Sequence, residues 1–364
     1  MSRRTGKIKK QPSTAIFTPI AIAAAIILLI SAQGCRSSAP GGGDNPPPTQ
    51  TGDAASQQSG RLNGQASQDY PDGTYSGNYT DGDRSGYGVM TYTDGRVYEG
   101  NWENNQRSGT GTLTWPDGNT YAGDWSDDAR TGAGVYTWAS GAIYKGHWDE
   151  NNRSGFGEMT HANGNIYEGY WENDQRSGEG TFTWKNGDVY TGNWVDDSRN
   201  GQGTLEWANG DVYKGNWSEN TRSGLGELTY ASGNIYAGSY ENDVKSGTGT
   251  FTWTDGDVYT GDWADDVRSG HGVMEYANGS RYEGDWLDNE ATGAGTLEYS
   301  NGNRYEGAFE HNELSGTGTY TWVNGDVFTG EWEHNVRSGY GVFTPVSGRT
   351  LDGMWEDGAF TGTN

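Results

Sequence analysis

Pairs of acidic residues are the first candidates for chemistry in this sequence. Asp127-Asp128, Asp196-Asp197 and Asp265-Asp266 recur at an equal spacing and offer the oxygen ligands that Ca²⁺ prefers. A calcium ion takes about six or more such ligands, however, and an arginine follows each pair closely, as Arg130 follows the first. We therefore expect these acids to be solvated loop residues beside a nearby arginine rather than a metal site.

The other reactive side chains do not form a recognisable catalytic or cofactor site. The histidines share no spacing, and no second cysteine is available to build a metal site with them. Several arginines that precede Ser-Gly or Thr-Gly could bind phosphate, but we expect each to satisfy carbonyl groups and acids in its own loop. The histidines are His147, His161, His271, His311 and His334, and the arginines are Arg84, Arg107, Arg130, Arg153, Arg176, Arg222 and Arg337. The sequence thus predicts no catalytic residue, no metal and no cofactor, and hence a protein that is not an enzyme.

The single cysteine, Cys35, is a candidate for covalent modification. Residues 1–10 are basic, residues 15–32 are apolar, and small residues lead directly to the cysteine, which is the order of an export signal. The ending resembles the lipobox of bacterial lipoproteins, although Ala32 stands where that family prefers Leu, Val or Ile. The resemblance implies cleavage after residue 34 and lipidation of Cys35. An uncleaved transmembrane anchor is the alternative, because the apolar stretch is just long enough to span a bilayer.

Composition divides the chain into three parts. Residues 1–34 form the predicted signal peptide. Residues 35–74 begin with the lipidated cysteine and continue as a segment rich in Pro, Gly, Ser, Gln and Asp, which cannot bury enough apolar surface to fold and is expected to be a flexible tether. Residues 75–364 repeat one pattern at a fixed period, which the step from Tyr98 to Tyr121 exemplifies. The sequence therefore predicts a tethered repeat array.

The repeat consists of two strand-like pieces, which Tyr98–Trp102 and Gly109–Trp115 exemplify. An aromatic residue opens each of twelve copies, from Tyr75 to Phe328, and Leu351 begins a truncated thirteenth copy. A fixed period of this length is typical of repeat architectures. A longer period, equal to three copies, relates loops and strands at the same time, which indicates growth by duplication of three-hairpin units.

The loop after the second strand decides which residues face each other. Pro116-Asp117-Gly118 is typical of a three-residue loop that ends in a left-handed glycine. This loop places Leu113 opposite Tyr121 and Gly109 opposite Trp125, so that every large ring lies on one face. A two-residue turn would scatter the apolar residues over both faces. We therefore predict an all-β fold: an elongated single-layer antiparallel sheet of about twelve tandem hairpins, with a right-handed twist.

The recurring motif Tyr-x-Gly-x-Trp followed by Gly-x-Gly resembles the MORN repeat (membrane occupation and recognition nexus), and it has the same period. The resemblance covers residues 75–355 or so. Substitutions are mild: Phe328 and Leu351 replace the first tyrosine, and Tyr79, Tyr240 and Phe309 replace the tryptophan. The family implies an elongated sheet of hairpins that scaffolds other proteins, and lipid head-group binding has also been proposed for it.

The candidate partner contact is an aromatic pair on the polar face of the predicted sheet. The thirteenth repeat position is usually small or polar, but in the first, fourth and seventh copies it is a larger residue, namely Tyr87, Phe156 and Leu225. A twist of ~20–25° per strand would turn successive three-hairpin units by roughly 120–150°, so these three cannot form one flat patch. Phe156 is expected to oppose Tyr170, either as an interface anchor or as a cross-strand pair that only steadies the sheet.

The net charge of the chain further limits the classes of partner that it can bind. The formal net charge is −25, and removing the five basic residues of the signal leaves −30. Such a chain repels nucleic acid and anionic phospholipid at long range. Two functions remain: a scaffold that binds an unknown envelope protein, and a lipoprotein that binds a surface polysaccharide or peptidoglycan. Either would reside in a bacterial cell envelope, lipid-anchored, and periplasmic or surface-exposed.

Overall fold

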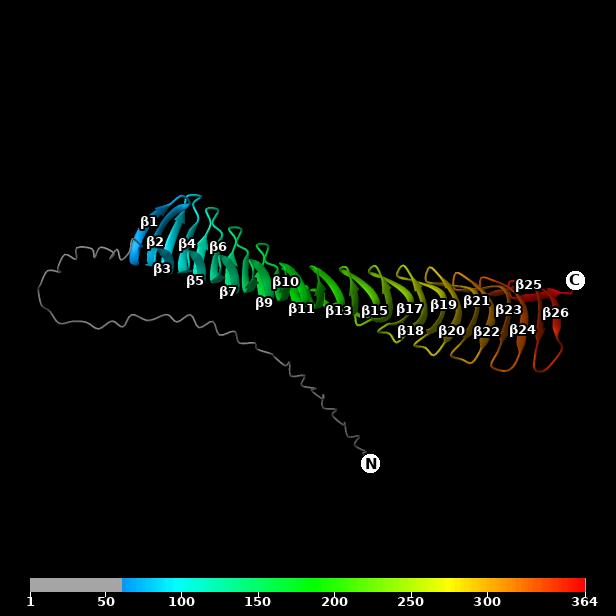
Figure 1. The fold of residues 1–364 in the computed structure, drawn as a ribbon. Helices are drawn as coiled ribbons and strands as arrows, with labels where there is room; N and C mark the ends of the chain where they lie inside the picture. Colours follow the sequence, from blue (N-terminus) through cyan, green and yellow to red (C-terminus); the bar gives the residue numbers. More distant parts are fainter. Residues whose placement is uncertain (1–60, 364) are drawn as a thin grey trace, which may run out of the picture. The chain divides into compact units, whose positions relative to one another are not determined.

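The computed structural model describes residues 61–363, which form one antiparallel β-sheet of 27 strands (Figure 1). Each strand is paired with the strands that precede and follow it in the chain. The strands are β1 Gly64–Tyr70, β2 Gly73–Thr80, β3 Asp83–Tyr92, β4 Val97–Glu103, β5 Gln106–Thr114, β6 Thr120–Ser126, β7 Ala129–Thr137, β8 Ile143–Asp149, β9 Asn152–Thr160, β10 Ile166–Glu172, β11 Gln175–Thr183, β12 Val189–Val195, β13 Ser198–Glu206, β14 Val212–Ser218, β15 Thr221–Thr229, β16 Ile235–Glu241, β17 Val244–Thr252, β18 Val258–Ala264, β19 Val267–Glu275, β20 Arg281–Leu287, β21 Glu290–Glu298, β22 Arg304–Glu310, β23 Glu313–Thr321, β24 Val327–Glu333, β25 Val336–Thr344, β26 Leu351–Glu356 and β27 Ala359–Gly362. Within these residues there is no helix that is long and apolar enough to span a membrane.

The three-residue loop and its register are confirmed. The Trp115 backbone N–H donates to the Asn119 carbonyl over 3.0 Å, and Gly118 adopts a φ of 91°. Leu113 opposes Tyr121, and Gly109 opposes Trp125. The predicted all-β, single-layer array of antiparallel hairpins is therefore correct, whereas the hand of its twist stays a prediction.

The loop after the first strand of each hairpin is a two-residue turn. Asn104 and Asn105 have φ values of 50° and 69°, and Asp127 and Asp128 have φ values of 49° and 67°. Two consecutive residues with positive φ are characteristic of the type I′ turn, which Asn and Asp tolerate better than other side chains. The acidic pairs are thus turn residues whose types suit the backbone.

The core is a row of rings on one face of the sheet, here called the aromatic face. Tyr98 is fully buried and Trp102 is 3% exposed, although no second layer of secondary structure covers them within residues 61–363. The Tyr98 ring meets Trp102 edge to face at 5.2 Å between centroids, and it meets Trp125 of the next hairpin in the same way at 5.4 Å. Such pairs contribute about 0.5–1.5 kcal/mol beyond area burial, so the rings couple each hairpin to the next.

Glycines make room for these rings. A Cβ atom added to Gly111 would lie 2.2 Å from the Tyr98 hydroxyl oxygen, and one added to Gly100 would lie 2.4 Å from the Gly111 Cα. The tyrosine ring therefore lies flat on the bare backbone of two paired strands. This arrangement buries a large side chain within a single layer, as the sequence predicts.

The sheet begins earlier than the sequence predicts. Strand β1 lies within the segment expected to be a tether and pairs along its length with β2. The Tyr70 hydroxyl donates to the Tyr79 hydroxyl over 3.2 Å, and the Arg84 guanidinium lies 5.2 Å from the Tyr70 ring centroid. A polar strand can join a sheet because the edge of β2 supplies its hydrogen-bond partners. The tether prediction is therefore wrong for residues 64–74.

The remaining N-terminal predictions fall on residues 1–60, which lie outside the described part of the chain. They are the signal peptide, Cys35 and the first part of the tether. At the other end, the truncated thirteenth copy forms a strand, since β26 pairs with β25 and places Gly353 opposite Gly341.

Candidate functional site

An arginine in each of several hairpins is bound by the turn of the following hairpin. The backbone N–H and Nε of Arg107 both donate to the Asp128 carboxylate, over 3.0 and 2.9 Å, and Nη2 donates to the Asp128 carbonyl over 2.8 Å. The guanidinium carbon also lies 4.3 Å from the Trp125 ring centroid. The side chain therefore links the aromatic core to a neighbouring turn.

This arrangement corrects two expectations. The acid pair Asp127-Asp128 binds Arg107, which precedes it by almost a whole repeat, and not the nearer Arg130; each arginine satisfies the next loop and not its own. Within residues 61–363 there is no group of three or more acidic, histidine or cysteine side chains that could hold a metal. The phosphate interpretation of Arg107 fails as well, because the guanidinium is already bonded to a carboxylate.

The five histidines are not brought together. His311 and His334 each bond to a glutamate of the preceding hairpin, at 2.7 Å from Glu290 and 2.8 Å from Glu313. The hydrogen bond to Glu290 raises the pKa of His311, and Glu313 acts likewise on the pKa of His334. Burial instead lowers the pKa of His161. They are isolated residues that support no shared catalytic role.

Phe156 of β9 and Tyr170 of β10 lie opposite each other on the other face, here called the polar face. Their rings meet edge to face at 5.6 Å between centroids. Phe156 is 42% exposed and Tyr170 is 51% exposed, so neither ring belongs to the core. The structure thus places the two predicted contact residues side by side in the register expected from the loop length.

The surroundings of this aromatic pair are acidic. Glu158 and Glu168 oppose each other two residues further along the same strands, and Lys145 opposes Glu158 from the other side. Two facing carboxylates on one exposed surface destabilise the sheet slightly, because like charges directly opposite repel each other. A partner that brings a basic group beside an apolar one would complement both features.

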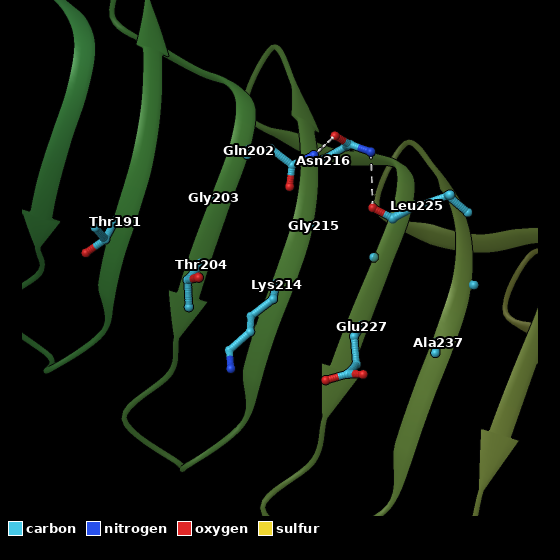
Figure 2. Close-up of a pocket in the computed structure, with 12 residues that line it drawn as sticks. Thr191, Gln202, Gly203, Thr204, Lys214, Gly215, Asn216, Leu225, Glu227 and Ala237 are labelled. Atoms are coloured by element: carbon cyan, nitrogen blue, oxygen red, sulfur yellow. Dashed lines mark hydrogen bonds between the residues drawn. The ribbon is translucent and has the colours of Figure 1, made fainter. Parts of the chain in front are cut away.

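A broad hollow lies further along the polar face, and the sequence did not predict it. It extends over β12–β16 and has a volume of about 840 Å³. Figure 2 shows Thr204, Lys214 and Glu227 on successive strands around it. The bare backbone of Gly203, Gly215 and neighbouring glycines forms part of its floor. The sequence indicates this hollow only weakly, because the glycines that form its floor are also required to make room for the rings of the aromatic face.

Leu225 lies on the rim of this hollow. Its side chain is 68% exposed, and its carbonyl accepts a hydrogen bond from Asn216 Nδ2 over 3.2 Å (Figure 2). Tyr87, which shares its repeat position, is 52% exposed and donates its hydroxyl proton to Glu99. A second hollow of about 480 Å³ lies over β23–β25 beside Tyr340. The thirteenth repeat position therefore carries a large exposed side chain in several copies.

Comparison with known families gives one match. The model of the family described as MORN repeat matches twelve consecutive segments: residues 75–95, 98–120, 121–143, 144–166, 167–189, 190–212, 213–235, 236–258, 259–281, 282–304, 305–327 and 328–348. These boundaries follow the aromatic residue that opens each hairpin. The search of curated proteins finds no match.

Several solved structures are similar to parts of the chain. The TCP10 domain of Danio rerio CPAP, in complex with a peptide of Danio rerio STIL, is 12% identical at a TM-score of 0.32, over 66% of this chain and 97% of that one. The TCP domain of Drosophila melanogaster SAS-4 is 17% identical at a TM-score of 0.28, over 42% and 83%. Virginiamycin B lyase from Staphylococcus aureus is 11% identical at a TM-score of 0.13, over 75% and 85%.

Proposed function

Because the chain belongs to the MORN-repeat family, we propose that it is a non-enzymatic scaffold that is lipid-anchored in a bacterial cell envelope and binds another envelope protein through its polar face. Repeat arrays of this kind present a long regular surface on which sequence can vary without disturbing the core. Here the rings that hold the sheet together occupy the aromatic face. The polar face is therefore open to variation and to contact.

The exposed pair of Phe156 and Tyr170 carries this proposal. A cross-strand aromatic pair contributes only about 0.2–1 kcal/mol to a sheet. Half-exposed aromatic rings contribute more free energy when a partner buries them, since tyrosine and other aromatic residues dominate the energetic centres of interfaces. The two rings stand on a surface of Thr, Asp and Glu, and the acidic residues Glu158 and Glu168 beside them favour a basic partner.

The test is site-specific crosslinking in the native envelope. A photoreactive phenylalanine analogue at position 156 should give a discrete adduct with one protein. The same analogue at position 179 provides the matched control, because Glu179 has the same repeat position one hairpin later. The adduct would be identified by mass spectrometry, and the identified protein would then be purified for a direct binding measurement.

The double variant Phe156→Ser, Tyr170→Ser should weaken that binding at least about tenfold, which corresponds to about 1.4 kcal/mol. Its melting curve should stay unchanged, since neither ring is part of the core. A lower melting temperature with unchanged affinity would instead assign the pair a purely structural role. Equal crosslinking from positions 156 and 179 would also contradict a localised interface.

The anchor is tested separately. Cells supplied with a labelled fatty acid should incorporate the label into the wild-type protein and not into the Cys35→Ser variant, because that thiol is the only one in the chain. The Ser38→Ala variant is a suitable control near the same site. Label that persists in Cys35→Ser would exclude lipidation there and leave the transmembrane anchor as the alternative.

A further inference from the structure

A second set of aromatic residues runs along one margin of the aromatic face. The residue that opens each three-residue loop is Trp or Tyr in ten of the twelve copies. Trp184 and Trp207 are examples; both pack against the core and yet are only partly buried. The tyrosines that open each hairpin are, in contrast, fully buried, as Tyr190 is. The structure thus separates the rings that build the sheet from rings that remain accessible.

Some arginines beside this margin have no carboxylate partner. Arg176 and Arg222 donate from Nε to Asp197 and Asp243, over 2.9 and 3.0 Å. The corresponding turn residue for Arg199 is Asn220, and the side chain of Arg199 bonds only through Nη2, to the Asn220 carbonyl, within the part of the chain that the structure describes. Its Nε proton is therefore available to another acceptor.

This arrangement recurs in every third hairpin. The guanidinium of Arg199 lies 6.0 Å from the Trp184 ring centroid, that of Arg268 lies 5.8 Å from Trp253, and that of Arg337 lies 5.9 Å from Trp322. The turn opposite Arg268 again provides an asparagine, Asn289. The three-hairpin duplication thus repeats one combination of an accessible indole and an arginine without a carboxylate.

The first of these combinations borders a cavity of about 270 Å³, here called the Trp184 cavity. Its lining includes Trp184, Trp207, Asp188, Asp243, Arg199 and Arg222. The two carboxylates and two guanidiniums leave the lining without net charge. The indoles offer flat apolar surfaces, and the charged groups offer hydrogen-bond donors and acceptors around them.

We propose that the Trp184 cavity, and the corresponding indole and arginine pairs beside Arg268 and Arg337, each bind a short segment of a neutral polysaccharide. The C–H faces of a pyranose ring pack against indole, and its hydroxyl groups both donate to carboxylates and accept from guanidinium. The neutral lining and the acidic chain select against a polyanion. The three sites lie three hairpins apart, which is ~29 Å at the usual strand spacing, so each is a separate site for its own sugar segment. This activity uses the face that the proposed protein interface does not.

The test uses substitutions that should leave the fold intact. Asn220→Asp gives Arg199 the carboxylate that Arg176 and Arg222 already have, so it should occupy the free Nε while keeping a turn residue that tolerates positive φ. Asn151→Asp is the matched control, because it makes the same change at the same turn position, opposite Arg130, which lies beside Tyr136 and not beside a tryptophan that opens a three-residue loop. Calorimetric titration of the intact mature chain with cellotriose and chitotriose gives affinity and number of sites, and melting curves verify folding.

We expect at least one of the two trisaccharides to bind the wild type, with one site fewer in Asn220→Asp and two fewer in Asn220→Asp, Asn289→Asp. The Asn151→Asp control should bind like the wild type. An unchanged number of sites in both Asp variants would overturn the proposal, and so would an equal loss in the control. Binding of a trigalacturonate in place of the neutral sugars would overturn it too, because the Arg199 site would then select an anion.

Discussion

At the scale of single residues, the array depends on glycines, because they have no side chain. The tyrosine that opens each hairpin lies on the backbone of two paired glycines, and no other residue leaves room for it. The consequence is an unusual core, in which the most sensitive positions carry no side chain at all. Core substitutions that add volume typically cost about 1–3 kcal/mol, because neighbouring atoms must move.

We predict that Gly111→Ala destabilises the hairpins around β5 and β6 by about 1–3 kcal/mol, because the new methyl group would lie 2.2 Å from the Tyr98 hydroxyl oxygen. Thr112→Ala is the control, since that side chain is exposed on the opposite face. Hydrogen exchange of the β4–β6 amides should accelerate strongly in the first variant and little in the second. Equal protection in both would show that the sheet can shift to accommodate the methyl group.

At the scale of hairpins, the bonds from Arg107 to the following turn act as a clasp between repeats. The Asp128 side chain is 45% exposed, so water screens much of the attraction between the charges. The clasp is more than an ion pair, however. The same carboxylate also accepts from the Arg107 backbone N–H, and Asp128 itself occupies a left-handed turn position.

We therefore predict that Asp128→Asn is mild, with a loss of at most about 1 kcal/mol, since an asparagine retains the backbone bond and the turn. Asp128→Ala should cost more, because alanine removes the acceptor and is strained at positive φ by about 1–3 kcal/mol. Denaturant titrations at low and high salt would measure both effects. If Asp128→Asn were as damaging as Asp128→Ala, the ion pair would be the main contribution.

Much of the hairpin could be predicted from the sequence, because its determinants are local. The turn residues around Gly118 and the alternation from Gly109 to Trp115 set the loop length and the register, and the position of Phe156 opposite Tyr170 follows from them. The partner of Arg107 could not be predicted in the same way. Every loop offers similar acceptors, so nothing in the sequence distinguishes an arginine's own turn from the next. Strand β1 could not be predicted either, because its partner supplies its stability.

At the scale of the whole molecule, the many buried tyrosines couple stability to high pH. Burial raises the pKa of Tyr190, Tyr213, Tyr259 and Tyr305 to about 12. The unfolded value is ~10, so the folded state favours the neutral phenol. Each of these groups therefore contributes stability that is fully present below pH ~10 and is lost as the pH rises towards 12.

We predict a steep alkaline unfolding transition between about pH 10 and pH 12. Circular dichroism of the sheet should disappear together with the rise in tyrosinate absorbance of the buried rings. The His334→Ala variant should unfold at the same pH, because that exposed side chain titrates well below this window. Tyrosinate absorbance that is complete at pH ~10 with the sheet intact would contradict the coupling.

The net charge of the chain leads to a second prediction at the scale of the whole molecule. At a formal charge of −30, a chain of residues 36–364 produced without the signal and the lipid should bind phosphatidylserine vesicles no better than neutral vesicles in moderate salt without divalent cations. Co-sedimentation measures this directly. Tight, salt-sensitive binding to the anionic vesicles would mean that a local basic surface outweighs the net charge.

Each described strand pairs with the strands before and after it in the chain. The array can therefore be lengthened or shortened by whole hairpins. Removing or inserting one whole hairpin would preserve every type of contact and would move the far end by ~9.6 Å. Two surfaces on the same sheet can therefore be brought closer together or further apart by recombination between similar units, without any new core. Evolution can therefore change the position of a binding site along the sheet in steps of one hairpin, without changing the residues of the site itself.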